Sequence, residues 1–139
     1  MEEIIEKIKG KAGFIIDMDG VIYHGNKLLP GVTEFLAWLE ASEKKYLFLT
    51  NASQRTPKEL HEKLKRLGIT VGEEHFYTSA LATASFLASQ KPNGSAFIIG
   101  DAGLIHAMYS AGYTTNNVNP DYVVVGDTNG YNFEKIELA

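Results

Sequence analysis

Apolar residues run along the chain in short blocks separated by longer amphipathic stretches. The blocks "GFIID" at 13–17, "YLFLTN" at 46–51 and "DYVVVG" at 121–126 are nearly continuous apolar runs. Such runs are typical of strands that are buried on both faces of a parallel sheet. Shorter blocks of the same kind, "HFYTS" and "AFIIG", lie at 75–79 and 96–100. The pattern therefore predicts several short buried strands.

Helical spacing of apolar residues fills most of the intervals between these blocks. The clearest helix follows Thr56, because Pro57 suits a first turn and Glu59 completes a capping box. Gly68 is the expected stop of this helix. Helical patterns also cover residues 33–45, 80–90, 104–112 and 131–139.

Strands that alternate with helices predict an α/β fold with a Rossmannoid parallel sheet. Ligands of such sheets bind beyond the carboxyl ends of the strands. Two polar pairs fall there, Asp17 with Asp19 and Thr50 with Asn51. The turn-forming stretch "QKPNGS" at 90–95 interrupts the pattern. We therefore expect one region over residues 1–91 and another over residues 92–139.

Composition narrows the classes of function. The 139 residues include 22% charged residues and no cysteine, which excludes disulfides, a thiol nucleophile and a cysteine zinc site. The net charge of −4, without a basic stripe, indicates no nucleic-acid partner. No apolar run approaches the roughly 18 residues of a membrane span. The first residues, "MEEIIEKIKGK", lack the basic start and apolar centre of a signal peptide. We expect a cytoplasmic protein.

The pair of carboxylates at the end of the first strand points to phosphate chemistry. Asp17 and Asp19 would repel each other, so the site needs a counter-ion, and oxygen ligands favour a hard cation such as Mg²⁺. Gly20 follows directly and allows a sharp turn next to a ligand. One aspartate can attack phosphorus and form an acyl phosphate, while the other carries a proton to and from the reacting oxygens.

Several stretches resemble the haloacid dehalogenase (HAD) superfamily. "DMDGV" from residue 17 is similar to its first motif, and "LFLTN" from residue 47 to its second. "DGVIYHGNKLLPG", "LTNASQRTPKEL" and "FYTSALATASFL" resemble the subfamily with a large inserted α/β cap, which includes NagD-like nucleotide phosphatases, pyridoxal phosphate phosphatases and p-nitrophenyl phosphatases. The resemblance implies the first part of a HAD core, followed by the first part of a cap.

The resemblance also implies roles for particular residues. Asp17 would be the nucleophile and a Mg²⁺ ligand, and Asp19 the general acid/base, with its backbone carbonyl on the metal. Thr50 and Asn51 would hold the transferring phosphoryl group, and Gly20 would let the loop close around it. The stretch at 21–29 would be the flap beside the site. The implied activity is Mg²⁺-dependent hydrolysis of a small phosphorylated metabolite through an aspartyl phosphate. Nucleotides, sugar phosphates and pyridoxal phosphate are candidate substrates.

The chain departs from the family pattern in one respect. The lysine and further aspartates that the family places after its cap are not found. Asp127, after Val-Gly, imitates the last motif, but its position suits a cap segment. We therefore expect the N-terminal part of a longer protein. By itself this chain would be inactive and poorly folded, or would form a homodimer that covers an exposed strand edge.

Two alternatives stay open. A phospho-accepting receiver domain also uses a strand-end aspartate, but it does not need an acid at the position of Asp19. A catalytically incomplete fragment or binding module fits the same residues. The loop residues Ser53 and Arg55 either face the substrate or hold their own loop, and Asp101 is expected to cap the helix that follows it.

Overall fold

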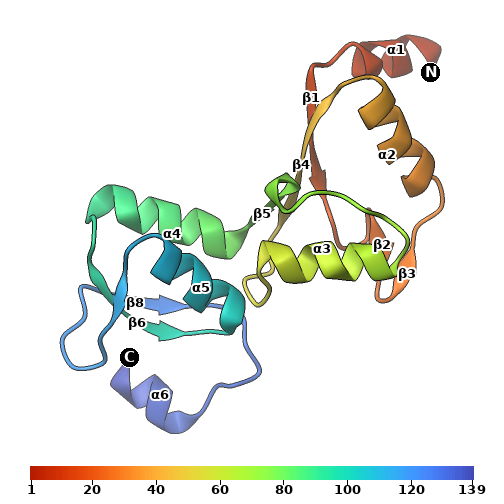
Figure 1. The fold of residues 1–139 in the computed structure, drawn as a ribbon. Coiled ribbons are helices and arrows are strands. Elements are labelled where there is room, and N and C mark those ends of the chain that lie inside the picture. Colours follow the sequence, from red (N-terminus) through yellow and green to blue (C-terminus); the bar gives the residue numbers. More distant parts are fainter.

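The computed structural model describes residues 1–139, which form two small parallel sheets, each with its own helices (Figure 1). The first sheet has the order β1-β4-β5, with β1 at Gly13–Asp17, β4 at Lys45–Thr50 and β5 at Phe76–Thr78. Helices α2 (Val32–Ala41) and α3 (Pro57–Arg66) pack against one face of it. We call these elements the first unit. Its core contains Ile16, Leu36, Leu39, Phe48, Leu60, Leu64 and Phe76.

The second sheet has the order β7-β6-β8 and is also parallel. Its strands are β6 (Ser95–Ile99), β7 (Thr114–Thr115) and β8 (Tyr122–Val125), and helices α4 (Ser79–Gln90) and α5 (Ala102–Ser110) pack on them. We call these elements the second unit. Its core contains Ala80, Ala84, Leu87, Ala96, Leu104, Ala107, Met108, Tyr113 and Val124.

The remaining elements are short. The stretch expected to form a flap is a hairpin of β2 (Tyr23–His24) and β3 (Lys27–Leu28). Helix α1 (Glu2–Lys9), which the sequence pattern did not predict, has no buried residue. A turn of 3-10 helix, η1, covers Glu73–His75, and α6 (Phe133–Leu138) ends the chain. None of the helices has the length and apolar character that a membrane crossing requires.

The local signals around α3 are confirmed. The Thr56 hydroxyl oxygen accepts from the Glu59 amide at 3.2 Å, and the Glu59 carboxylate accepts from the Thr56 amide at 2.7 Å. Pro57 occupies the first turn, and Gly68 ends the helix with φ at 93°. That left-handed conformation strains any residue with a Cβ, so the sequence itself ends the helix there.

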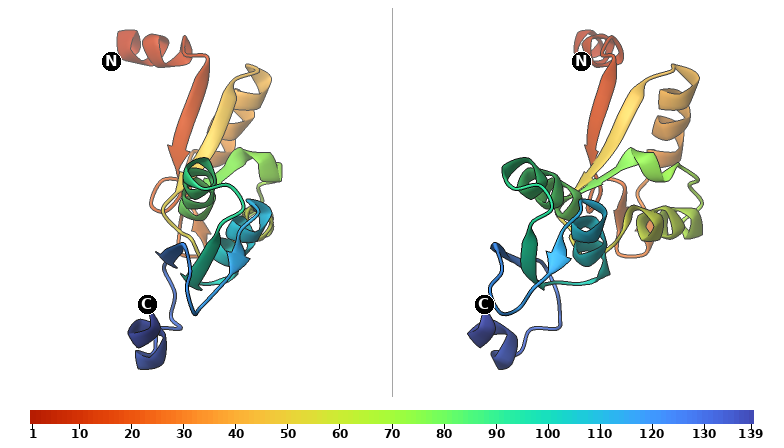
Figure 2. Two further views of the ribbon diagram at one scale, coloured as in Figure 1. Left: turned by 90° about the vertical axis from the view of Figure 1, so that its left-hand side faces the viewer. Right: turned by 60° about the vertical axis from the view of Figure 1, so that its left-hand side comes forward.

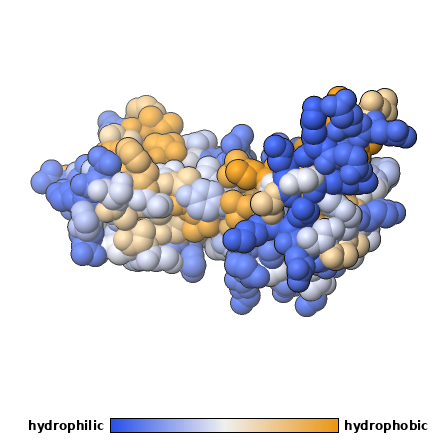
Figure 3. Space-filling view, turned by 90° about the horizontal axis from the view of Figure 1, so that it is seen from above, coloured by the Kyte–Doolittle hydropathy of each residue, from blue (hydrophilic) through white to orange (hydrophobic).

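The expectation that the strands are buried on both faces is wrong. Ile16 is 6% exposed, but its neighbour Ile15 is 74% exposed, and Leu49 and Val125 are also exposed. In the first unit the reason is that α2 and α3 pack on the same face of the sheet, which leaves the face of Ile15 and Leu49 without a helix (Figure 2). Seen from above, apolar surface lies open to solvent in the middle of the molecule (Figure 3).

The two units meet through the loop that follows β4. The Gly103 amide, in α5, donates to the Gln54 carbonyl at 2.9 Å, and the Asp127 amide donates to the Ser53 hydroxyl at 2.9 Å. The α/β class with parallel sheets is confirmed. A domain boundary after residue 91 stays a prediction, although α4 packs into the second core. The termini lie at opposite ends of the molecule (Figure 2).

Candidate active site

The two carboxylates predicted as the reacting pair flank a buried residue. Met18 is completely buried, and its amide donates to Asp17 Oδ1 at 2.8 Å. The Met18 carbonyl accepts from the Ile22 amide at 2.9 Å, which ties the loop back onto the core. Asp17 and Asp19, on either side, are exposed. The buried methionine therefore anchors the loop while both carboxylates stay in solvent.

Gly20 allows the turn that follows this pair. Its φ is 78°, in the left-handed region, and its amide donates to the Tyr23 carbonyl at 2.8 Å. A Cβ at this position would meet no atom within 4 Å. The backbone conformation, and not lack of space, is what favours glycine here.

Thr50 ends the neighbouring strand β4, and Asn51 follows it. Asp17 is paired with Leu49 in the β1–β4 register, so Thr50 lies one residue further along the same sheet edge. The buried Thr50 hydroxyl oxygen accepts from the Ala52 amide at 3.2 Å, which leaves its proton free to donate. The Asn51 carbonyl accepts from the Ser79 hydroxyl at 2.6 Å, while its side chain is exposed. The sheet thus brings both predicted pairs to one edge.

Charged and aromatic side chains surround Asp19 in a pocket of about 220 Å³. Its charged and aromatic lining comprises Asp19, Tyr23, Arg55, Lys63 and Asp127, whereas Asp17, Gly20, Thr50 and Asn51 do not line it. The Lys63 ammonium lies 3.6 Å from the centroid of the Tyr23 ring, a cation–π contact. The pocket therefore places cations from other segments beside one of the two carboxylates.

Burial and neighbouring charges shift two pKa values in this pocket. Burial raises the pKa of the Tyr23 hydroxyl, and the adjacent Asp19 carboxylate raises it further. Burial lowers the pKa of Lys63, and so does the Arg55 guanidinium, while the Asp19 charge acts in the opposite direction. Asp19 is therefore close enough to interact electrostatically with residues of the hairpin and of α3.

Sequence reasoning missed part of this arrangement. Tyr23 and Lys63 were not predicted as site residues. Arg55 was predicted either to face the substrate or to hold its own loop, and in the structure it lines the pocket that contains Asp19. Asp127, interpreted as a cap residue, lines the same pocket. The available signal was the basic run "EKLKRLG" on α3, which places cations three residues apart on one helix face.

The expectation that Asp101 caps the next helix is wrong for its side chain. Asp101 stands at the N-cap position of α5 but makes no capping hydrogen bond, because its carboxylate accepts from the Thr128 hydroxyl instead. Thr128 comes from the loop after β8, 27 residues away. A local sequence pattern cannot indicate that partner.

The oxygen atoms at the carboxyl end of β1 provide some, but not all, of the ligands that a hard cation needs. Asp17 Oδ1 is used by the Met18 amide, whereas Oδ2 and the Asp19 carbonyl accept no hydrogen bond. No group of three or more His, Cys, Asp or Glu side chains is placed to hold a metal ion. Mg²⁺ commonly binds proteins through one or two carboxylates and takes its other ligands from water and phosphate oxygens. Asp17 with the Asp19 carbonyl suits that mode of binding.

Comparison with protein families places this chain in a known group. The model of the haloacid dehalogenase-like hydrolase family matches residues 14–114. The chain is 40% identical over 126 residues to dihydroxyacetone phosphatase of Corynebacterium glutamicum, covering 91% of this chain and 46% of that protein. It is also 40% identical over 125 residues to ribonucleotide monophosphatase NagD of Escherichia coli, covering 90% and 50%.

Solved structures of named phosphatases also resemble this chain. NagD from Escherichia coli superposes with a TM-score of 0.86 at 38% identity, over 91% of this chain and 50% of that one. The 4-nitrophenylphosphatase from Thermotoga maritima superposes with a TM-score of 0.89 at 30% identity, over 94% and 50%. The chain thus spans about half the length of the curated relatives it matches.

Proposed function

The chain belongs to the haloacid dehalogenase-like hydrolase family, and from this premise we propose that it carries the reacting carboxylates of a phosphatase. The observation that carries the proposal is the pair of exposed carboxylates, Asp17 and Asp19, held on either side of the buried Met18 at the carboxyl end of β1. Thr50 ends the neighbouring strand, and its hydroxyl proton is free to donate a hydrogen bond. Phosphoryl transfer needs this combination of a nucleophile, a proton carrier and a donor to the phosphoryl oxygens.

The proposed reaction has two steps. A carboxylate oxygen of Asp17 attacks phosphorus, the bond from phosphorus to the leaving oxygen breaks, and Asp19 gives that oxygen a proton. Water then attacks the phosphorus of the aspartyl phosphate, Asp19 takes a proton from the water, and Asp17 is restored as inorganic phosphate leaves. Thr50 and Asn51 donate to the phosphoryl oxygens in both steps.

Mg²⁺ is the proposed cofactor, and Asp17 with the Asp19 carbonyl would hold it. When bound, the cation neutralises charge between the carboxylates and the phosphate dianion. The proposed substrates are small phosphomonoesters. Relatives are named ribonucleotide monophosphatase, dihydroxyacetone phosphatase and acid sugar phosphatase, which supports this range.

Asp17→Asn tests the proposal, with Asp101→Asn as the matched control. Both are aspartates at the carboxyl end of a sheet strand, but the Asp101 carboxylate accepts a hydrogen bond from Thr128. We expect Asp17→Asn to lower Mg²⁺-dependent turnover of p-nitrophenyl phosphate by about a thousandfold or more, because the amide is not a nucleophile. Asp101→Asn should leave turnover within about threefold.

A second measurement does not depend on turnover. Beryllium fluoride with Mg²⁺ should shift the NMR signals of residues 17–20 in the unmodified chain and in Asp101→Asn, but not in Asp17→Asn. Labelling of Asp17 without turnover would favour the catalytically incomplete module. Turnover that survives Asp17→Asn would contradict the assignment of the nucleophile.

We also propose that the free edge of β1 is a contact for a second copy of the chain. β1 pairs only with β4, and Ile15 on this strand is 74% exposed. Unpaired strand edges recruit other strands, and a lysine on such an edge opposes pairing. Sedimentation should show dimers that Ile15→Lys converts to monomers. Monomers of the unmodified chain at high concentration would contradict this contact.

A further inference from the structure

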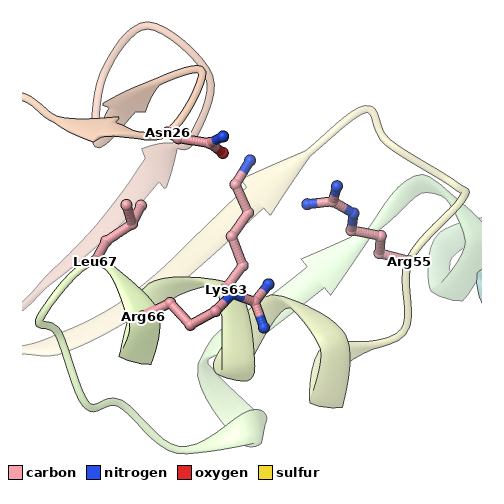
Figure 4. Close-up of a pocket in the computed structure, with 5 residues that line it drawn as sticks. All are labelled: Asn26, Arg55, Lys63, Arg66 and Leu67. Carbon is pink, nitrogen blue, oxygen red and sulfur yellow. The ribbon is translucent and has the colours of Figure 1, made fainter.

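A strongly basic pocket of about 320 Å³ lies beside the Asp19 pocket (Figure 4). It is lined by Asn26 from the β2–β3 turn, Arg55 from the loop after β4, and Lys63, Arg66 and Leu67 from the end of α3. Four of these five residues are polar or cationic. In Figure 4 the polar ends of Asn26, Lys63 and Arg55 point towards a common space. Three separate segments therefore converge on one concave cationic site.

The cations of this pocket form no close ion pairs, although the Asp19 carboxylate acts on Lys63 from the adjoining pocket. None of the ion pairs in the molecule includes Arg55, Lys63 or Arg66. Burial lowers the pKa of Lys63, and the positive charges of Arg55 and Arg66 lower it further, while the Asp19 carboxylate acts in the opposite direction. Repulsion between like charges around one pocket lowers the stability of the folded chain, and an anion bound among them would offset that repulsion.

The pocket adjoins the one that contains Asp19 of the proposed reaction site. Arg55 and Lys63 line both the basic pocket and the adjoining one that contains Asp19. The Lys63 ammonium also lies 3.6 Å from the centroid of the Tyr23 ring, which lines the Asp19 pocket. A small molecule that reacts next to Asp19 would therefore extend towards the cations.

We propose that the pocket of Asn26, Arg55, Lys63 and Arg66 binds a second anionic group, a phosphate or a carboxylate, of the substrate whose phosphomonoester reacts at Asp17. The inference rests on the proposed function and narrows its substrate class to phosphomonoesters with an additional negative charge. Arginine suits this role, because its planar guanidinium donates two parallel hydrogen bonds to such groups.

Binding without chemistry is the first test. Inorganic phosphate is titrated in a chelator, without Mg²⁺, and followed by NMR. Saturable changes in chemical shift are expected at the pocket residues. The affinity for phosphate should be about tenfold weaker in Arg66→Gln, because this variant loses one charge-assisted hydrogen bond. Lys65→Gln is the control, since Lys65 lies on the same helix but outside the pocket. Both side chains are exposed, so both variants should fold. Absent binding, or equal weakening by the two variants, would overturn the proposal.

Substrate choice is the second test. Glycerate phosphate and glycerol phosphate have similar size, but only the former carries a carboxylate. We expect Arg66→Gln to lower the ratio of kcat/KM for glycerate phosphate over glycerol phosphate about tenfold, and Lys65→Gln to leave it unchanged. Turnover with an unchanged ratio would mean that the pocket holds only a free anion, and would overturn the assignment to the substrate. Loss of all turnover with phosphate binding intact would count against the proposed reaction instead.

Discussion

The two units are built from the same parallel strand–helix repeat, yet their strand ends differ. β1 ends in exposed carboxylates on either side of a buried methionine. β6 leads through Gly100 to Asp101, whose carboxylate accepts from Thr128. β8 leads to Gly126, where a Cβ would lie 2.7 Å from Leu104 and 2.8 Å from Ser53. The acids at the end of β1 thus stay open to solvent, whereas the carboxylate of the acid after β6 is bound by a neighbour.

The largest expected effect tests whether the two cores are independent. Phe48→Ala removes a fully buried ring from the first core, and we expect a loss of about 3–5 kcal/mol in the free energy of unfolding. Hydrogen exchange should rise in β1, β4 and β5 before it rises in β6. Equal loss of protection in both sheets would show that they unfold as one.

The matched control for this change lies on the open face of the same sheet. Ile15→Ala shortens a side chain that is 74% exposed, so the free energy of unfolding should stay within about 0.5 kcal/mol. A larger loss would show that the open face of the sheet is covered in solution.

A smaller effect is expected at the contact between the units. A Cβ on Gly103 would lie 2.5 Å from the Ser53 carbonyl oxygen and 2.6 Å from that of Arg55. Gly103→Ala should therefore separate α5 from the loop after β4, at a cost of about 1–3 kcal/mol in thermal or denaturant unfolding. Gly10→Ala is the control. A Cβ on Gly10 would lie 3.4 Å from the Glu6 carbonyl oxygen, so the free energy of unfolding should stay nearly unchanged. Loss of phosphate binding in Gly103→Ala would show that this contact also positions Arg55.

The smallest effect concerns an ion pair of the second unit. The Asp121 carboxylate accepts from the Lys91 ammonium and from the Ser95 amide, the latter at 2.8 Å. Lys91 and Ser95 hold the pKa of Asp121 below its ordinary value of 3.8, and Asp121 raises that of Lys91 above 10.5. The stability from Asp121 is therefore complete above pH 3.8 and is lost as the pH falls through the lowered pKa.

Asp121→Asn should show this dependence on pH. Its melting temperature should lie slightly below that of the unmodified chain near neutral pH, and the difference should shrink in acid. Exchange in β6 and β8 should rise, while β1 stays unchanged. A difference that does not depend on pH would mean that the carboxylate contributes through shape alone.

Local patterns were reliable where the cause of the structure is local. The start of α3 at Thr56 and its end at Gly68 both depend on residues within a few positions. The patterns failed where a distant partner decides. The exposed face of β1, with Ile15 in solvent, follows from which face the helices cover. The occupied carboxylate of Asp101 depends on Thr128.

The sequence by itself determined the strand–helix alternation and the position of Asp17 and Asp19 at the end of an anchored strand. These follow from side-chain periodicity and from the conformation that Gly20 permits. Only the tertiary structure decided which other charges stand beside them. Asn26, Arg55 and Lys63 come from three segments, and packing of the hairpin, the loop and α3 places their polar ends around one pocket. The spacing of residues along the chain does not indicate that packing, because the contacts join residues that are far apart in the sequence and belong to no common local pattern.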